Sequence, residues 1–404
     1  MAEYSPMMQH YLDTKKDYKD SILFYRLGDF YEMFFDDAIL ASRELELTLT
    51  GKECGQEERA PMCGVPFHAA ENYIARLISK GYKVAICEQM EDPKQAKGIV
   101  KREVIRVVTP GTVIESNLLD EKKNNYIMSV YKSGIYFGIA VCDVSTGDFR
   151  ATQIKETNNF SAALDEISRY SPAEIVVNNL MYDTTEEIAK IRERFQIYIS
   201  KQEDNKFSNN VEELTSKYNV VDESENKIEI NDKTLCICAI NGLLTYILET
   251  QKTNLDHINK IILYNNTKYF LKMDIHTRRN LELTEKLRDK SKKGTLLWVL
   301  DKTSTSMGGR RLRRWINDPL LDIEKINKRL NSVKELKDNP ILRGDIADLL
   351  KKVYDIERLV GKISYGNANA RDLISLKNSV KQLPELKKIM SNTESTLLKE
   401  LYNE

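Results

Sequence analysis

The fold of the first part of the chain depends on the stretch Leu23-Phe-Tyr-Arg-Leu-Gly-Asp-Phe-Tyr-Glu-Met-Phe-Phe-Asp-Asp37. Its first half is an apolar and aromatic run of strand length, and the pair Gly28-Asp29 favours a turn. The two-residue period of a strand then places Phe30 and Glu32 on one face. A bare aromatic ring beside a carboxylate makes a poor core pair, because a buried carboxylate needs a partner. We therefore expect this face to be open to a ligand.

Length and composition indicate a globular chain of two to three domains. The 404 residues are 41% hydrophobic and 30% charged, so substantial cores can form. Lys and Arg number 61, as do Asp and Glu, and a formal net charge of zero gives no support to nucleic-acid binding. Any contact with DNA must therefore come from a local patch.

Targeting and cysteine usage point to the cytoplasm. The sequence has no apolar run of membrane-spanning length and no secretory signal at its start, so we expect a cytoplasmic protein with no membrane partner. Its six cysteines form no CxxC pair and few histidines accompany them. We expect reduced thiols, with neither a disulfide framework nor a zinc site.

Residues 1–115 as a whole are predicted to form a small mixed α/β domain. Ser5-Pro6 is a favourable helix start, Asp36-Asp37 suits the positive end of a helix dipole, and Gly81 suits a helix end. The expected elements are helices over about 5–18, 36–45 and 70–80, strands over 46–50, 83–87 and 100–108, and polar loops over 51–58 and 88–93.

The segment from Gly28 to Phe34, Gly-Asp-Phe-Tyr-Glu-Met-Phe, resembles the mismatch-reading motif of the MutS family of DNA mismatch repair sensors. In that family the Phe stacks beside a mispaired base from the minor groove, and the Glu hydrogen-bonds that base. The matching positions here are Phe30 and Glu32. The resemblance extends, without gaps, over further stretches of the domain, which are 61–69, 84–89 and 106–112.

The role implied by the resemblance is chemically sound for these two side chains. An apolar wedge unstacks a base step and kinks the duplex, and a mismatched step costs the least to deform. The field of nearby phosphates favours protonation of a carboxylate, and a protonated Glu32 would donate a hydrogen bond to a base acceptor. The alternative interpretation is a buried Phe30 on a strand with a surface Glu32.

The family's mismatch domain also touches the DNA backbone near the wedge. By position and charge, the residues expected to make such contacts are Lys52, Met62, His68 and Arg102. The alternative is that these side chains belong to an ordinary solvated surface.

Residues 116–125 are polar and are predicted to be a linker. Residues 126–232 then show the element order of a ribonuclease-H-like fold, and the MutS family carries a connector domain of this kind at this place. The elements are strands over 126–131, 135–143 and 147–153, a helix over 160–170, a strand over 174–178 and a helix over 185–195. Residues 201–231 are expected to be a mobile or loosely packed excursion.

This fold order raises a rival function, that of a Mg²⁺-dependent nuclease. In nucleases of this fold an Asp on the first strand binds the metal together with other carboxylates. The candidates are Asp143, Asp148, Asp165 and Glu166. However, Asp143 ends the second strand, and Asp143 and Asp148 more simply flank a turn at 145–147. A third hypothesis is a structural repair scaffold that does not read DNA.

Residues 233–404 are predicted to be helical, because aliphatic side chains follow helical spacing from Thr234 onward, with one short strand near 270–273. The segments that resemble the core and lever of the family are 276–283, 303–315 and 366–373. A basic cluster of Arg310, Arg311, Arg313 and Arg314 lies in this region. We expect ion-paired internal packing for these arginines, in preference to a DNA-facing patch.

The sequence contains no G-x-x-x-x-G-K-[ST], so these residues hold no P-loop. We predict no catalytic residue, cofactor site or metal site, and therefore no enzyme activity in this chain. Because MutS proteins continue into a DNA clamp and an ATPase, the resemblance implies ATP and Mg²⁺ only for a missing C-terminal half, and an incomplete core domain here. The implied partners are duplex DNA with mismatches or small loops, a second copy in a homodimer formed mainly through the missing half, and a MutL-type repair protein.

Overall fold

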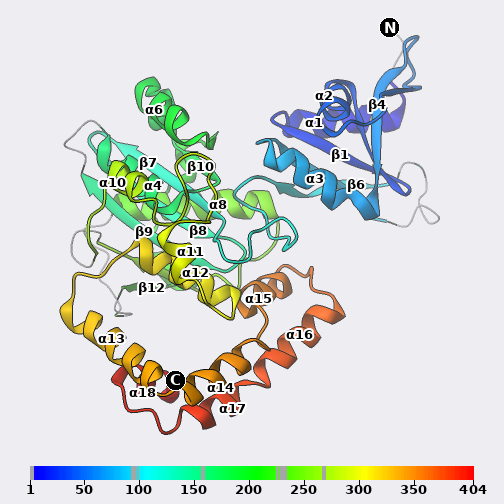
Figure 1. Cartoon of the computed structure of the whole chain (residues 1–404). Helices are drawn as coiled ribbons and strands as arrows, with labels where there is room; N and C mark the ends of the chain where they lie inside the picture. Colours follow the sequence, from blue (N-terminus) through cyan, green and yellow to red (C-terminus); the bar gives the residue numbers. More distant parts are fainter. Residues whose placement is uncertain are drawn as a thin grey trace. The chain divides into compact units, whose positions relative to one another are not determined.

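The computed structural model describes residues 4–91, 98, 100–155, 160–223, 226, 234–265 and 270–404. The chain forms two units, one of Met1–Val113 with Leu244–Thr253 and one of Ile114–Leu243 with Asn254–Glu404. In Figure 1 the first unit is mainly blue, and the second runs from cyan to red. All six cysteines are free and buried, as expected. Within the described ranges no helix is long and apolar enough to cross a membrane.

The first unit is built on a six-stranded mixed sheet with helices beside it (Figure 1). In sheet order the strands are β3 (Thr50–Lys52), β4 (Ala60–Pro66), β2 (Phe30–Phe34), β1 (Ser21–Leu27), β5 (Lys83–Gln89) and β6 (Arg102–Val108). Only β1 and β5 run parallel, and the other neighbours are antiparallel. The helices are α1 (Pro6–Asp17), α2 (Phe35–Leu45) and α3 (Ala70–Ser79), with the short 3₁₀ turn η1 (Phe67–Ala69).

The three predicted helices of this unit are confirmed, but the strand predicted over 46–50 is wrong and strand β4 was missed. The strand expected over 46–50 begins only at Thr50, because Glu46 ends α2 in the left-handed conformation with φ 59°. Strand β4 was not expected, since Pro61, Gly64 and Pro66 interrupt its alternation. Strand β5 continues to Gln89, into the expected loop over 88–93, and residues 92 and 93 of that loop lie outside the described ranges.

A buried carboxylate joins two helices to the sheet of the first unit. Asp37 is only 6% exposed, and it accepts hydrogen bonds from the Tyr11 hydroxyl at 3.2 Å, the Leu23 amide at 2.9 Å and the Lys15 ammonium at 2.9 Å. Burial, together with the charge of Asp37, raises the pKa of Tyr11, so its hydroxyl stays protonated and donates. Each of these donors reduces the cost of burying the carboxylate.

The second unit contains a seven-stranded sheet of ribonuclease-H-like order, as the sequence predicts. In sheet order the strands are β11 (Tyr198–Lys201), β10 (Glu174–Val177), β7 (Tyr126–Ser133), β8 (Tyr136–Asp143), β9 (Asp148–Lys155), β13 (Lys260–Leu263) and β12 (Asn219–Asp222). Strands β7, β8 and β9, which come first along the chain in this sheet, pair antiparallel. Strands β10 and β11 run parallel to β7. Strand β13 pairs with β9, so the sheet continues past residue 232, where we expected this domain to end.

Part of the expected excursion over 201–231 is regular structure. It contains η2 (Asp204–Lys206), α7 (Val211–Lys217) and β12, which pairs in parallel with β13. The polar composition of this segment hid β12, because a strand at the edge of a sheet needs few apolar residues. The last part of the segment, residues 224–225 and 227–231, lies outside the described ranges.

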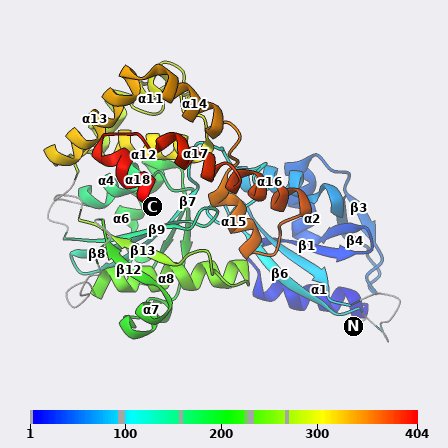
Figure 2. The same cartoon turned by 90° about the horizontal axis from the view of Figure 1, so that it is seen from below.

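Helices cover both faces of this sheet. On one face, side chains of α4 (Ser161–Tyr170), α5 (Asn179–Asp183) and α6 (Thr185–Phe195) form a common core with β7, β8 and β10. The part of helix α8 (Thr234–Gln251) that belongs to this unit, up to Leu243, lies on the opposite face (Figure 2). It approaches β8 so closely that a Cβ added to Gly138 would lie 1.8 Å from the Leu235 carbonyl oxygen.

The remainder of the second unit is helical, as predicted. Its helices are α10 (Ile275–Leu281), α11 (Leu296–Leu300), α12 (Ser306–Asn317), α13 (Ile323–Asp338), α14 (Pro340–Leu350), α15 (Ile356–Ser364), α16 (Ala370–Val380), α17 (Leu383–Met390) and α18 (Thr396–Asn403). Several begin after a side-chain cap, for example Thr305, Asp322 and Asn369. The short strand expected at 270–273 is a single bridge between Phe270 and Leu320. Figure 1 shows α13, α14, α17 and α18 side by side in orange and red.

We predict that two glycine substitutions in this unit have opposite effects on stability. Gly138→Ala should lower the free energy of unfolding by about 3 kcal/mol, because backbone atoms of α8 occupy the space of the new methyl group. Gly344→Ala, in α14, should raise it by about 0.5–1 kcal/mol, because its Cβ meets nothing within 4 Å and alanine favours the helix. Urea unfolding followed by circular dichroism measures both. A neutral Gly138→Ala would contradict the close packing of α8 on β8.

Candidate nucleic-acid interface

Along one face of β2, the exposure of the side chains increases from the buried Phe34 to the exposed Phe30. Phe34 is 1% exposed and packs edge-on against Tyr11, with ring centroids 4.9 Å apart. The Glu32 side chain is 17% exposed, and Phe30 at the start of the strand is 47% exposed. Tyr31, on the opposite face, is buried. The predicted alternation is therefore observed, and the alternative of a buried Phe30 is wrong.

The turn that precedes Phe30 is held from two directions. Gly28 has φ 57°, a left-handed conformation that glycine adopts without strain. The Arg26 guanidinium donates to the Gly28 carbonyl oxygen at 2.5 Å, and the Phe67 amide donates to the Asp29 carbonyl oxygen at 3.0 Å. Phe30 itself lies between Leu27 of β1 and Pro66 of β4 in the sheet. The exposed ring therefore projects from a fixed backbone.

Among the described residues, Glu32 forms an ion pair with one side chain, which comes from two strands away. The Lys52 ammonium of β3 lies 2.5 Å from a Glu32 carboxylate oxygen, across the intervening strand β4. Gly64 of β4 pairs with Glu32, and a Cβ there would lie 3.5 Å from Glu32 Cγ and 3.2 Å from the Tyr31 carbonyl oxygen. With Lys52 33% exposed, this ion pair is open to solvent and to a ligand.

The structure brings some of the expected backbone-contact residues to the surface and buries others. Lys52 is partly exposed beside Glu32, and His68 is exposed in η1. Met62 is half-buried against the core that contains Phe34. Arg102 is 7% exposed and donates to the carbonyl oxygens of Arg26 and Val100, each at 2.8 Å. In this structure Arg102 supports the backbone of β1 and is not accessible to a phosphate.

Two further residues at this surface were not predicted from the sequence. Phe67 is 43% exposed, and the Arg26 guanidinium stacks on its ring with 3.8 Å between Cζ and the ring centroid. Arg26 also pairs with Glu88 at 3.3 Å, and Glu88 accepts a short hydrogen bond from Tyr31. Burial and the interaction with Glu88 raise the pKa of Tyr31, which keeps its hydroxyl protonated. Because strand β4, which places Phe67 at this surface, was not expected, no signal in the sequence pointed to Phe67.

The carboxylates proposed for a nuclease are engaged by donors of the protein itself. Asp143 accepts from the Ser145 amide and hydroxyl at 3.0 and 2.7 Å, and Asp148 accepts from the Tyr126 hydroxyl at 2.8 Å. The remaining two also have protein donors, since Asp165 accepts from the Ile275 amide at 3.0 Å, and Glu166 accepts from the Tyr264 hydroxyl at 2.7 Å and pairs with Arg169 at 3.5 Å. No group of three or more potential metal ligands occurs in the described part of the chain.

The arginine cluster of α12 is mainly ion-paired, as expected. Arg310 is 4% exposed and contacts Asp355 and Glu357, each at 2.6 Å. Arg313 pairs with Glu285 at 3.3 Å, and Arg314 lies 3.8 Å from Asp148. Arg311 is exposed, with its guanidinium 5.9 Å from the Trp315 ring centroid. This cluster joins α12 to its neighbours within the second unit.

A small mixed sheet, followed by a ribonuclease-H-like sheet and a series of helices, is consistent with domains I to III of the MutS family. Sequence profiles agree with this assignment along almost the whole chain. Those described as MutS domain I, MutS domain II and MutS domain III match residues 5–117, 125–259 and 276–403. The chain belongs to the MutS family.

Individual relatives support the same assignment. The chain is 55% identical over 401 residues to a DNA mismatch repair protein MutS of Ruminiclostridium cellulolyticum, covering 99% of this chain and 45% of that protein. It is 53% identical over 406 residues to that of Acetivibrio thermocellus, covering 100% and 46%. It is 53% identical over 399 residues to that of Clostridium novyi, covering 99% and 43%. The chain thus spans a little under half the length of these relatives.

Lys52 and Asp37, two charged residues of the first unit, should differ in their contribution to the free energy of unfolding. Lys52→Ala should change the free energy of unfolding by less than about 1 kcal/mol, because its pair with Glu32 is partly solvated. Asp37→Ala should lower it by about 2–4 kcal/mol, because buried donors lose their acceptor. Thermal and urea unfolding of both variants give the comparison. Equal losses would show that the Lys52–Glu32 pair is part of the structural core.

Proposed function

We propose that this chain binds duplex DNA containing a mismatched or unpaired base and recognises the defect with Phe30 and Glu32, as the first step of DNA mismatch repair. The main support is the exposure of Phe30, a large aromatic ring on a strand whose other apolar side chains, Tyr31, Met33 and Phe34, are buried. Membership of the MutS family and the match to its domain I support the same substrate. Family membership alone supports the finer statements about a homodimer, a MutL-type partner and a cytoplasmic location.

The wedge role rests on rigidity as well as exposure. An inserted side chain must unstack a base step at a cost of a few kcal/mol, and a mismatched step costs less than a paired one. A ring that moved freely would lose rotational freedom on insertion, and this entropy cost would weaken binding to the defect. Here the turn at Gly28-Asp29 is bonded to Arg26 and to Phe67, so the backbone of Phe30 is already fixed. The preference for a defect therefore comes from the DNA, whose deformation energy differs between paired and mispaired steps.

The ion pair beside the wedge explains how a carboxylate can approach DNA. In the free protein Lys52 neutralises Glu32 at 2.5 Å, which limits repulsion between that carboxylate and the phosphates. On binding, Lys52 transfers to a phosphate and Glu32 turns to the base. The exchange costs little, because a partly exposed ion pair contributes about 1 kcal/mol or less. Lys52, His68 and the half-buried Met62 remain our proposed backbone contacts, whereas the buried Arg102 is assigned to the fold.

The ATP hydrolysis of the family is proposed to lie outside these 404 residues, because the matched domains are I to III and the sequence has no P-loop. No described feature favours the nuclease over mismatch binding. The scaffold hypothesis differs from ours in one measurable respect, which is that Phe30 would not affect DNA preference.

Phe30→Ala should abolish the preference for a defect without abolishing DNA binding. Competition between a duplex with one G·T pair or one unpaired T and the fully paired duplex, at stated salt, measures the preference by fluorescence anisotropy. We expect the wild-type chain to favour the defective duplex by about tenfold or more, which corresponds to about 1.4 kcal/mol or more. The variant should bind both duplexes equally, because phosphate contacts carry no sequence information.

A matched control for this experiment is Tyr136→Ala, which removes an aromatic ring of the second unit that is 40% exposed. This control should keep the wild-type preference. A preference that survives Phe30→Ala, or one that Tyr136→Ala removes equally, would contradict the wedge assignment and favour the scaffold hypothesis.

Substitutions of Glu32 test the base contact separately from the wedge. If a protonated Glu32 donates a hydrogen bond, Glu32→Gln should keep most of the discrimination, because the amide also donates. Glu32→Ala should lose part of it, by about 1–2 kcal/mol in the difference between the two duplexes. The same competition assay serves, with measurements at pH 6 and pH 8. Equal discrimination by the Ala, Gln and wild-type chains would remove Glu32 from the base-reading site.

A further inference from the structure

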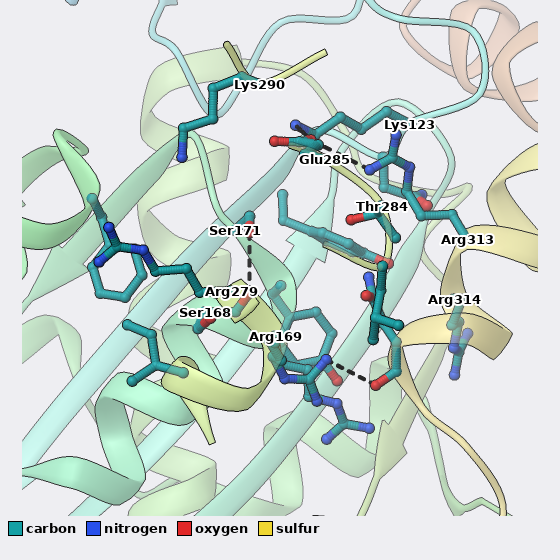
Figure 3. Close-up of a pocket in the computed structure, with 18 of the residues that line it drawn as sticks. Lys123, Ser168, Arg169, Ser171, Arg279, Thr284, Glu285, Lys290, Arg313 and Arg314 are labelled. Carbon is teal, nitrogen blue, oxygen red and sulfur yellow. Dashed lines mark hydrogen bonds and ion pairs between the residues drawn. The ribbon is translucent and has the colours of Figure 1, made fainter. Parts of the chain in front are cut away.

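A cavity of about 650 Å³ lies within the second unit (Figure 3). Its walls come from the ends of α4 and α6, from α10 and α12, from the start of β7 and from the segment 283–290. Ten of the lining side chains are Lys or Arg and only three are Asp or Glu, so the walls carry a clear excess of positive charge. This excess contrasts with the zero formal net charge of the whole chain.

Some of these cations are neutralised by carboxylates of the protein. Lys123 and Arg313 share Glu285 at 2.9 and 3.3 Å, and Arg169 pairs with Asp318 at 2.6 Å. These pairs fix the walls and leave little charge available to a ligand.

Among the described residues, four other lining cations have no carboxylate at ion-pair distance, although the charge of Lys290 is felt by Glu285. In the part of the chain that the structure describes, no carboxylate forms an ion pair with Arg194, Arg279, Lys286 or Lys290. Arg194, Arg279 and Lys290 line the cavity and are exposed to solvent. Figure 3 shows Lys290 on one side of this space and Arg313 and Arg314 on the other.

One wall of the cavity also holds a cation that is largely removed from water. The Arg278 guanidinium donates to the carbonyl oxygens of Met273 and Asn317, at 3.3 and 2.8 Å. Burial lowers the pKa of Arg278, and the charge of Arg169 adds to this effect although Asp318 opposes it. An anion in the cavity would stabilise this charge.

We propose that this cavity binds a compact polyphosphate, such as the phosphate chain of a nucleotide. Several cations converge on one space, and guanidinium groups match phosphate geometry through paired hydrogen bonds. The volume lies within the range of small-molecule sites, roughly 300–1,000 Å³. Phe195, Leu283 and Leu287 give the cavity an apolar part, which would accommodate a base or sugar beside the phosphates. Duplex DNA is too wide to enter a cavity of this size.

The test is isothermal titration calorimetry of the 404-residue chain with inorganic triphosphate, ATP and orthophosphate, without added Mg²⁺ and at stated salt. We expect one site per chain for triphosphate and ATP and much weaker binding of orthophosphate, because fewer charges are neutralised. Tighter binding of ATP than of triphosphate would assign the apolar part to a nucleoside, and the reverse order would assign the site to free polyphosphate. The double variant Arg279→Glu/Lys290→Glu should weaken binding by about tenfold or more.

The matched control is Lys387→Glu, which reverses an exposed charge on α17 that does not line the cavity. It should change the affinity by less than about twofold, because surface charges beyond a Debye length are screened. Circular dichroism and the DNA competition assay confirm that each variant is folded. Absence of saturable binding by the wild-type chain, or equal weakening by the control and the double variant, would overturn the proposal and leave a water-filled polar cavity.

Discussion

The pairing register of β2 between β1 and β4 is the constraint on which the proposed DNA-reading surface of Phe30 and Glu32 depends. Because side chains alternate along a strand, this register places Phe34, Glu32 and Phe30 on one face. Helix α1 covers the Phe34 end of that face through Tyr11, and the Phe30 end extends beyond the cover. A slip of one residue would bury Phe30 and expose Tyr31. The same hydrogen bonds that hold the sheet therefore also present the wedge.

Charged groups divide between structure and function according to how many fixed donors surround them. Asp37 is buried with several protein donors, and Arg310 is buried with two carboxylates, so both are committed to the fold. Glu32 has a single partly exposed partner, and Arg279 and Lys290 line an open cavity. A group with one exchangeable partner, or with no ion pair among the described residues, can bind a ligand at small cost. The same criterion assigns Arg102 to the fold, although its charge alone suggested a DNA contact.

Much of the fold and the centre of the candidate site could be predicted from the sequence, because they depend on local signals. Such signals are the alternation around Phe30, the capping residues of the helices, and the apolar runs and turns that form β7, β8 and β9 of the ribonuclease-H-like sheet. The features that could not be predicted depend on contacts with residues elsewhere in the sequence. Strand β4 lacks regular alternation and is held by β2 and β3, β12 is held by β13, and Arg102 is buried by contacts with β1. The Lys52–Glu32 pair crosses an intervening strand that the sequence did not reveal.

The most direct measurement of the central claim is the fluorescence of 2-aminopurine placed beside an unpaired T in a DNA duplex, because this base brightens when it is unstacked. Addition of the wild-type chain should increase the signal at the defect and leave a fully paired duplex carrying the same probe unchanged. Phe30→Ala should bind the defective duplex without the increase, since phosphate contacts remain and the wedge is lost. An equal increase with the wild-type chain and the variant would show that another group opens the base step and would contradict the account.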